Sequence, residues 1–202
     1  RPLVAGTSID SDEGLGTGTA GCFVSNGRGL HILTNAHVVG NRQGAKVFQP
    51  GLLDDRTPID RKPIGKVTKG YFPRRSFGMM DAALVSVDEN IFGLAIPMIG
   101  PVMGVNSKPR PGTILRKFGR TTMYTEARLY ATMTDTFVIY PDGVQRVRGM
   151  IMAGPMSAPG DSGSLILDDQ NKAVALLFAG SNKVTIAIPI QRVLDKLRVR
   201  IL

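Results

Sequence analysis

The chain has 202 residues, 43% of them hydrophobic, and a mean hydropathy of +0.04. This composition supplies a sizeable apolar core, but no apolar stretch approaches the roughly 20 residues that cross a bilayer, so we expect no membrane partner. The net charge of +9 favours an anionic partner or surface.

The single cysteine, Cys22, excludes an intrachain disulfide. Disulfides are typical of proteins in oxidising compartments, so we expect the chain in a reducing one, cytoplasmic rather than secreted. No signal peptide is visible, and the start at Arg1 rather than methionine leaves the native N-terminus open. Within the segment 21–24, Cys22 is interpreted as a small packed hydrophobe and not as a nucleophile.

Periodicity predicts short strands along most of the chain, with tight turns at Asn26-Gly27 and Asp142-Gly143. Strands spaced this closely, without helical patterns between them, indicate an all-β fold of antiparallel barrels. The first set of predicted strands covers residues 20–25, 30–34, 45–49, 64–68 and 82–87. The second set covers residues 114–118, 125–133, 136–140, 144–152, 164–167, 173–178 and 184–188.

A proline-rich segment, 97–111, separates the two sets of strands and is typical of a connection. It predicts an N-terminal subdomain over residues 1–105 and a C-terminal subdomain over residues 106–202. Only the tail has helical spacing, because apolar residues recur there three and four positions apart. A helix is therefore expected at about 190–200, and its apolar face comprises Ile190, Val193, Leu194, Leu197 and Ile201.

The sequence Gly160-Asp161-Ser162-Gly163, followed by an apolar run, predicts a serine hydroxyl on a tight turn before a buried strand. A serine hydroxyl is a poor nucleophile alone and needs a histidine base oriented by a carboxylate. His37 follows one apolar segment and Asp81 heads another, so they are candidates for these two roles. The N–H groups of Gly160 and Ser162 are candidates for an oxyanion hole.

With these residues in the order His37, Asp81, Ser162, the chain resembles the chymotrypsin-like (trypsin-like) serine peptidases. The resemblance implies two six-stranded antiparallel β-barrels with the active site in the cleft between them, and a C-terminal helix. It implies a serine endopeptidase that hydrolyses protein or peptide substrates through an acyl-enzyme on Ser162, with His37 as general base and Asp81 as orienter. Asp60 and Asp88 remain alternatives to Asp81. No cofactor or metal is expected.

The segment 118–122, Phe-Gly-Arg-Thr-Thr, is similar to the Gly-Arg-Thr-Thr stretch of bacterial α-lytic-type proteases, in which the arginine pairs with the aspartate before the nucleophile. By this resemblance, Arg120 is expected to pair with Asp161. A carboxylate buried behind an oxyanion loop needs such a partner, because an unpaired buried charge costs several kcal/mol. The pair would give a site that forms without cleavage of the N-terminus.

In this family the residue six positions before the nucleophile lies at the floor of the primary specificity pocket, and here that residue is Met156. An uncharged floor gives no basis for a preference for lysine or arginine and favours apolar substrate residues. The strand that contains Phe178, Ala179 and Gly180 is expected to form a wall of the pocket and to pair with extended substrate.

A basic stretch at 61–75, interleaved with aromatic residues, suggests a different class of function. A catalytically silent module on the peptidase fold would use this stretch to bind an anionic partner such as nucleic acid. A solvated strand and loop is the more frequent explanation, and no nucleic-acid motif accompanies these residues. Self-processing from a polyprotein is a third interpretation, and the oligomeric state is open.

Overall fold

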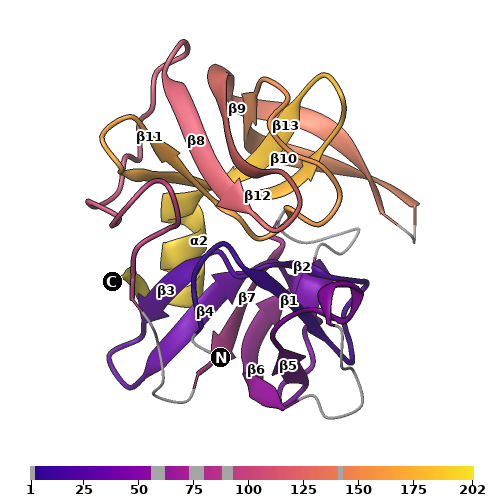
Figure 1. The fold of residues 1–202 in the computed structure, drawn as a ribbon. Coiled ribbons are helices and arrows are strands. Elements are labelled where there is room, and N and C mark those ends of the chain that lie inside the picture. The colour runs from indigo at the N-terminus through magenta and orange to yellow at the C-terminus, as the bar shows by residue number, and fades with distance from the viewer. Residues whose placement is uncertain (1–2, 56–61, 73–79, 88–92, 141–142) are drawn as a thin grey trace.

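The computed structural model describes residues 3–55, 62–72, 80–87, 93–140 and 143–202. Its strands form two stacked β units, and the C-terminal helix lies where the two units meet (Figure 1). The predicted all-β fold with a C-terminal helix is confirmed. The boundary at residues 105 and 106 stays a prediction.

The first unit is a sheet with two more strands than the resemblance implies. Its strands are β1 (Ser8–Ser11), β2 (Gly18–Thr19), β3 (Cys22–Ser25), β4 (Leu30–Thr34), β5 (Lys46–Phe48), β6 (Pro63–Tyr71), β7 (Ala82–Ser86) and β14 (Arg200–Ile201). They are ordered β14-β3-β4-β7-β6-β5-β1-β2. The two extra strands are β2 and β14. Strand β2 pairs with β1 over two residues, and β14 returns from the C-terminal end of the chain to pair with β3.

The second unit is a closed barrel of six antiparallel strands, as expected. The strands are β8 (Ile114–Gly119), β9 (Met123–Tyr140), β10 (Gly143–Ala153), β11 (Leu165–Asp168), β12 (Ala173–Gly180) and β13 (Thr185–Pro189). Around the barrel their order is β10-β13-β12-β11-β8-β9. Strands β9 and β10 form a long hairpin ribbon that extends to one side of the barrel (Figure 1).

Strand β9 runs continuously through a region where the sequence predicts two strands, 125–133 and 136–140. The alternation of apolar and polar residues breaks between these two segments, where the pairing of β9 with β10 is irregular. Met133 and Gly149 have φ of +56° and +62°, and the register shifts between Val147 and Met150. A bulge of this kind bends a strand without ending it.

Helix α2 (Ile190–Leu197) joins the two units through its apolar face. Contrary to the prediction, Ile201 lies in β14 and not in the helix. The other four side chains at the predicted spacing, Ile190, Val193, Leu194 and Leu197, are all buried. They belong to one apolar cluster that also includes residues of the first sheet and of the barrel. The helix ends at Arg198, which has a left-handed conformation, and the chain then enters β14.

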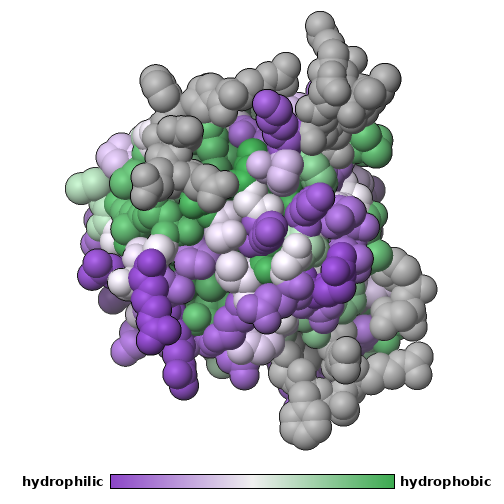
Figure 2. All heavy atoms as spheres, turned by 90° about the horizontal axis from the view of Figure 1, so that it is seen from below, coloured by the Kyte–Doolittle hydropathy of each residue, from purple (hydrophilic) through white to green (hydrophobic). Residues whose placement is uncertain are grey.

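Polar and charged side chains cover much of the surface below the first sheet, with hydrophobic atoms gathered at one side (Figure 2). Helices long and apolar enough to cross a membrane are absent from the described part of the chain. Part of the basic stretch, including Arg61, Arg74 and Arg75, lies outside the described residues. In the described part, the ammonium groups of Lys69 and Lys196 lie 5.5 and 5.0 Å from the ring centroid of Tyr71.

We predict that Ile190→Ala lowers the free energy of unfolding by about 2 to 5 kcal/mol, because it opens a cavity at the junction of α2 with both units. Equilibrium denaturation measures this change. The neighbouring exposed residue supplies the control: Gln191→Ala should alter stability by less than about 0.5 kcal/mol. Equal effects of the two substitutions would contradict the packing described for α2.

Candidate active site

His37 and Asp81 are brought together by the pairing of two neighbouring strands. Strand β4 ends at Thr34, opposite Ala83 near the start of β7. The helix α1 (Ala36–Val39) that follows β4 therefore lies beside the residue that precedes β7. The His37 Nδ1 atom is 2.6 Å from Asp81 Oδ2, and the backbone N–H of His37 donates to Asp81 Oδ1 at 3.0 Å.

The carboxylate of Asp81 is almost completely buried, and further groups fix it. The side chain is 1% exposed, whereas that of His37 is 19% exposed. The Asn35 side-chain amide donates to the carbonyl of Asp81 at 2.6 Å, and the Tyr140 hydroxyl donates to Asp81 Oδ2 at 3.4 Å. A carboxylate at Nδ1 holds the ring as the tautomer that carries the proton on this nitrogen, so Nε2 is left as an acceptor.

Tyr140 is a site residue that sequence reasoning missed. It lies at the end of β9, in the second unit, and reaches an acid at the head of β7 in the first. The alternating burial at the end of β9, where Val138 and Tyr140 are buried and Phe137 and Ile139 are exposed, is a signal that the hydroxyl faces inward. The pattern alone does not identify the carboxylate that it meets.

Ser162 lies in the loop before β11, where the backbone leaves two N–H groups without acceptors. The N–H groups of Gly160 and Ser162 donate to no group in the described part of the chain. By contrast, three neighbouring N–H groups donate to carbonyl oxygens of the chain, those of Asp161, Gly163 and Ser164. Two N–H groups on alternate residues of one turn are suited to binding a single oxygen that carries negative charge.

The first unit holds the Ser162 loop through its backbone. The N–H of Thr19 donates to the Ser162 carbonyl at 2.8 Å, and the Thr19 hydroxyl donates to the Gly160 carbonyl at 2.9 Å. Next to Thr19, Gly18 contacts both Val38 and the Ser162 carbonyl so closely that a Cβ atom there would overlap with Val38. Residues 18 and 19 thus hold the Ser162 loop close to α1, which carries His37.

The three predicted residues are therefore gathered at the junction of the two units. Within the described residues, the hydrogen bonds do not include one between the Ser162 hydroxyl and the His37 ring. In enzymes without substrate, catalytic hydrogen bonds are often long and tighten when the substrate binds.

Asp161 is paired with Lys117, and the predicted pair with Arg120 is wrong. Neither Asp161 nor Lys117 has an exposed side chain, and Lys117 Nζ lies 3.3 Å from Asp161 Oδ2. The ammonium also donates to the Thr122 hydroxyl and to the Met123 carbonyl. A signal for Lys117 exists in the sequence, because it shares the inward face of β8 with Leu115 and Gly119.

Several hydrogen bonds add to the charge of Lys117 in holding the Asp161 carboxylate. Burial alone would raise its pKa, but N–H groups of Ala158 and Thr122, the Thr122 hydroxyl and the Lys117 ammonium outweigh burial and lower it. The N–H of Thr121 donates to Asp161 Oδ1 at 2.9 Å. Asp161 is therefore ionised at neutral pH and ties the Ser162 loop to the turn after β8.

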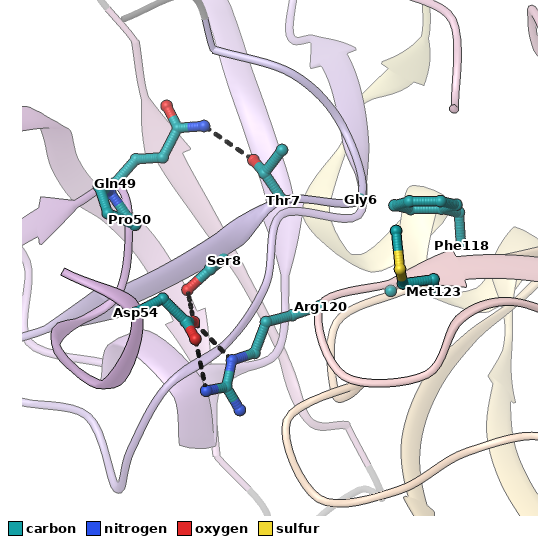
Figure 3. A pocket seen from close by; sticks show the side chains of 10 residues that line it. Gly6, Thr7, Ser8, Gln49, Pro50, Asp54, Phe118, Arg120 and Met123 are labelled. Carbon is teal, nitrogen blue, oxygen red and sulfur yellow. Dashed lines mark hydrogen bonds and ion pairs between the residues drawn. The ribbon is translucent and has the colours of Figure 1, made fainter. Parts of the chain in front are cut away.

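Arg120 pairs instead with an acid of the first unit. Its Nε and Nη2 atoms lie 2.6 and 2.8 Å from the two carboxylate oxygens of Asp54, which also accepts a hydrogen bond from the Ser8 hydroxyl (Figure 3). This bidentate pair borders a cavity of about 490 Å³, whose wall on the barrel side includes Phe118 and Met123. The side chain of Arg120 is only 18% exposed, and its guanidinium is bound by Asp54 rather than by the buried carboxylate of Asp161.

The residues predicted to contact substrate have different positions. Met156 and Phe178 are 3% and 5% exposed and belong to the apolar core, whereas Ala179 is half-buried and Gly180 is exposed. Strand β12 pairs with β13 as far as Gly180, but its pairing with β11 ends at Leu176. On that side, the edge from residue 178 to residue 180 has no neighbouring strand among the described ones.

Two hydroxyl groups beside this edge were missed by sequence reasoning. The Ser157 hydroxyl lies 3.0 Å from the Thr185 hydroxyl, which also accepts the N–H of Met156 at 3.1 Å. A Cβ atom on Gly180 would lie 2.7 Å from the Ser157 oxygen. Ser157, and not the thioether of Met156, thus lies next to the backbone of Gly180.

Cys22 is buried in β3, and burial raises the pKa of its thiol to about 12. A thiol with this pKa is not ionised near neutral pH, so it has no thiolate to act as a nucleophile. This agrees with its interpretation as a packed hydrophobe. The expectation of a reducing compartment stays a prediction.

The comparisons with known proteins agree with this geometry. The family model of the trypsin-like peptidase domain matches residues 18–176. A probable serine protease of Bradyrhizobium tropiciagri is 31% identical over an alignment of 103 residues, and the comparison covers 45% of this chain and only 13% of that protein. None of these comparisons supports an anionic partner.

Solved structures share the fold over the whole chain. The chymotrypsin of Cellulomonas bogoriensis has a TM-score of 0.74 and 22% identity, and the comparison covers 100% of this chain and 99% of that one. An α-lytic protease homologue has a TM-score of 0.69 and 18% identity over 98% of both chains. The chain belongs to the trypsin-like peptidase family of serine peptidases.

Proposed function

We propose that this protein is an endopeptidase that cleaves peptide bonds through an acyl-enzyme on Ser162. His37 Nε2 accepts the Ser162 hydroxyl proton as the oxygen attacks the substrate carbonyl carbon. The imidazolium then donates this proton to the leaving amine, and the acyl group stays on Ser162. In the second half of the reaction the same nitrogen takes a proton from water as the water oxygen attacks the ester carbon. The imidazolium then returns this proton to the Ser162 oxygen as the ester bond breaks and the acid is released.

The 2.6 Å contact between His37 Nδ1 and the buried carboxylate of Asp81 carries this proposal. A carboxylate with little access to water stabilises the imidazolium that forms during each proton transfer, and its position prevents the ring from turning. The Tyr140 hydroxyl and the His37 N–H both donate to Asp81, so the carboxylate is held in place from two sides. Asp81 thus has the role of orienter in the proposed triad.

The N–H groups of Gly160 and Ser162 would bind the oxyanion. The support is that both donate to no group of the described chain, while the N–H groups between and after them do. Donors that are already oriented need no rearrangement when charge develops on the oxygen. Each such donor typically contributes about 3 kcal/mol to binding of the transition state.

Substrate would bind in extended form along the open edge of β12. Residues 178–180 lack a neighbouring strand on the β11 side among the described strands, so Ala179 and Gly180 are proposed to pair with the substrate backbone. Met156 and Phe178 would support the pocket from within the core. Because this region offers apolar groups and hydroxyls bonded to one another, we propose a preference for uncharged substrate side chains at the bond that is cleaved.

Covalent labelling by a fluorophosphonate probe tests this function. We expect rapid labelling of the wild-type protein, none of Ser162→Ala, and a rate about six orders of magnitude lower for His37→Ala. Ser181→Ala, which removes an exposed hydroxyl after β12, is the matched control and should be labelled normally. Labelling that survives in Ser162→Ala would contradict the assignment of the nucleophile. A folded wild-type protein that neither reacts with the probe nor cleaves any member of a peptide library would contradict the proposed function.

Lys117→Met should lower the free energy of unfolding by about 3 to 5 kcal/mol, because Asp161 is then a buried charge without a cationic partner. The rate of labelling at Ser162 should fall as well, because Asp161 no longer fixes the loop. Lys117→Arg keeps the charge and should retain much of both properties. Denaturation and labelling measure the two effects.

Lys183→Met is the control for Lys117→Met, since this lysine is exposed in the turn between β12 and β13. It should change the stability by less than about 0.5 kcal/mol. If Lys117→Met were as stable and as reactive as this control, Lys117 would have no part in fixing the loop.

A further inference from the structure

The β9–β10 ribbon has two faces of opposite character near its tip. Its inner face is buried and carries Tyr140, whose hydroxyl reaches Asp81, together with Val138 and Val147. Its outer face exposes three large apolar side chains, which are 66%, 83% and 64% exposed in Phe137, Ile139 and Val144. Solvent-exposed apolar groups that gather in one place mark a surface that contacts something else.

The strand register makes the outer side chains one surface. Ile139 lies directly opposite Val144, and Phe137 lies directly opposite Arg146. Side chains at opposite positions of antiparallel strands are close neighbours. The apolar pair therefore lies nearest the tip, followed by a mixed pair of one aromatic ring and one guanidinium.

Two exposed arginines follow Val144 on the same face of β10. Arg146 and Arg148 are exposed and share one carboxylate, that of Asp135, at 3.1 and 3.9 Å. The Arg192 guanidinium of α2 adds a third positive charge by donating to the Arg148 carbonyl at 3.0 Å. In the described part of this region, two guanidinium groups thus share one carboxylate, and a third lies beside the Arg148 backbone.

We propose that the outer face of the β9–β10 ribbon is a docking surface for an anionic lipid bilayer. Ile139 and Val144 would enter the boundary between headgroups and acyl chains, and Phe137 would lie at the level of Arg146. Arg146 and Arg148 follow Val144 by about 7 and 13 Å along β10, at a rise of about 3.3 Å per residue. This separation fits apolar groups inserted by about 5 to 10 Å while the guanidinium groups remain among the phosphates.

The charge of this face favours an anionic lipid surface over a second copy of the chain. A symmetric contact between outer faces of two copies would bring Arg146 and Arg148 of both copies together. The net charge of +9 adds to this repulsion and is complementary to an anionic bilayer.

This proposal revises the expectation that the chain has no membrane partner. That expectation was based on the lack of an apolar stretch that could span a bilayer. Peripheral contact needs only exposed apolar groups together with basic ones. The proposal involves no catalytic step and holds whether or not Ser162 is a nucleophile.

The absence of tryptophan from the chain allows a direct test. Ile139→Trp places a single fluorophore on the outer face, and its emission should shift to shorter wavelength with phosphatidylcholine vesicles that contain about one third phosphatidylserine. Leu53→Trp is the matched control, because Leu53 is 74% exposed but lies in η1 (Leu52–Asp54) of the first unit. Its emission should not change, and pure phosphatidylcholine should shift neither variant.

Co-sedimentation with the same vesicles separates the apolar and the charged contributions. Ile139→Asp combined with Val144→Asp should weaken binding by about tenfold or more, and Arg146→Gln by about fivefold. Arg28→Gln removes an exposed arginine of the β3–β4 turn and should have no such effect. About 0.5 M NaCl should weaken the binding of the wild-type protein, because the Debye length falls to about 4 Å.

Three results would overturn the proposal. One is equal binding to vesicles with and without phosphatidylserine. Another is an emission spectrum of Ile139→Trp that does not respond to anionic vesicles while the variant keeps the thermal unfolding of the wild type. The third is a dimer in solution that the substitutions at Ile139 and Val144 dissociate, which would assign the outer face to a second copy of the chain.

Discussion

The buried pair of Lys117 and Asp161 is the interaction on which the site depends. It joins the end of β8 to the loop that carries Ser162, and neither side chain is exposed to solvent. The turn after β8 also contains Arg120, which binds Asp54 of the first unit through two hydrogen bonds. The segment 117–120 therefore holds the Ser162 loop through Lys117 and binds the first unit through Arg120.

Much of the fold could be predicted from the sequence, as could the candidate residues that the structure gathers at one place. Residue types of strong chemical meaning identified His37, Asp81 and Ser162, because a hydroxyl nucleophile needs a base and an acid. The helix at Ile190–Leu197 followed from apolar spacing. These features depend on local patterns and on the chain order of a few groups, and both can be read without coordinates.

Other features depend on contacts between segments that are far apart in the sequence. The sequence alone does not reveal these contacts. The wrong assignment of Arg120 arose because it was carried over from the resemblance to α-lytic-type proteases, in which the arginine pairs with the aspartate before the nucleophile. Lys117 shares the inward face of β8, so it meets Asp161. Tyr140 was missed because its partner Asp81 is 59 positions away and belongs to the other unit.

The pairing of β14 with β3 has a consequence for how the molecule forms during translation. Cys22–Ser25 leaves the ribosome well before Arg200–Ile201, its neighbour at that edge and the last of the described strands. Until then, the backbone groups of this edge have no partner, and such groups are prone to pair with another polypeptide. This edge is therefore open to mispairing until the chain has been synthesised as far as Ile201.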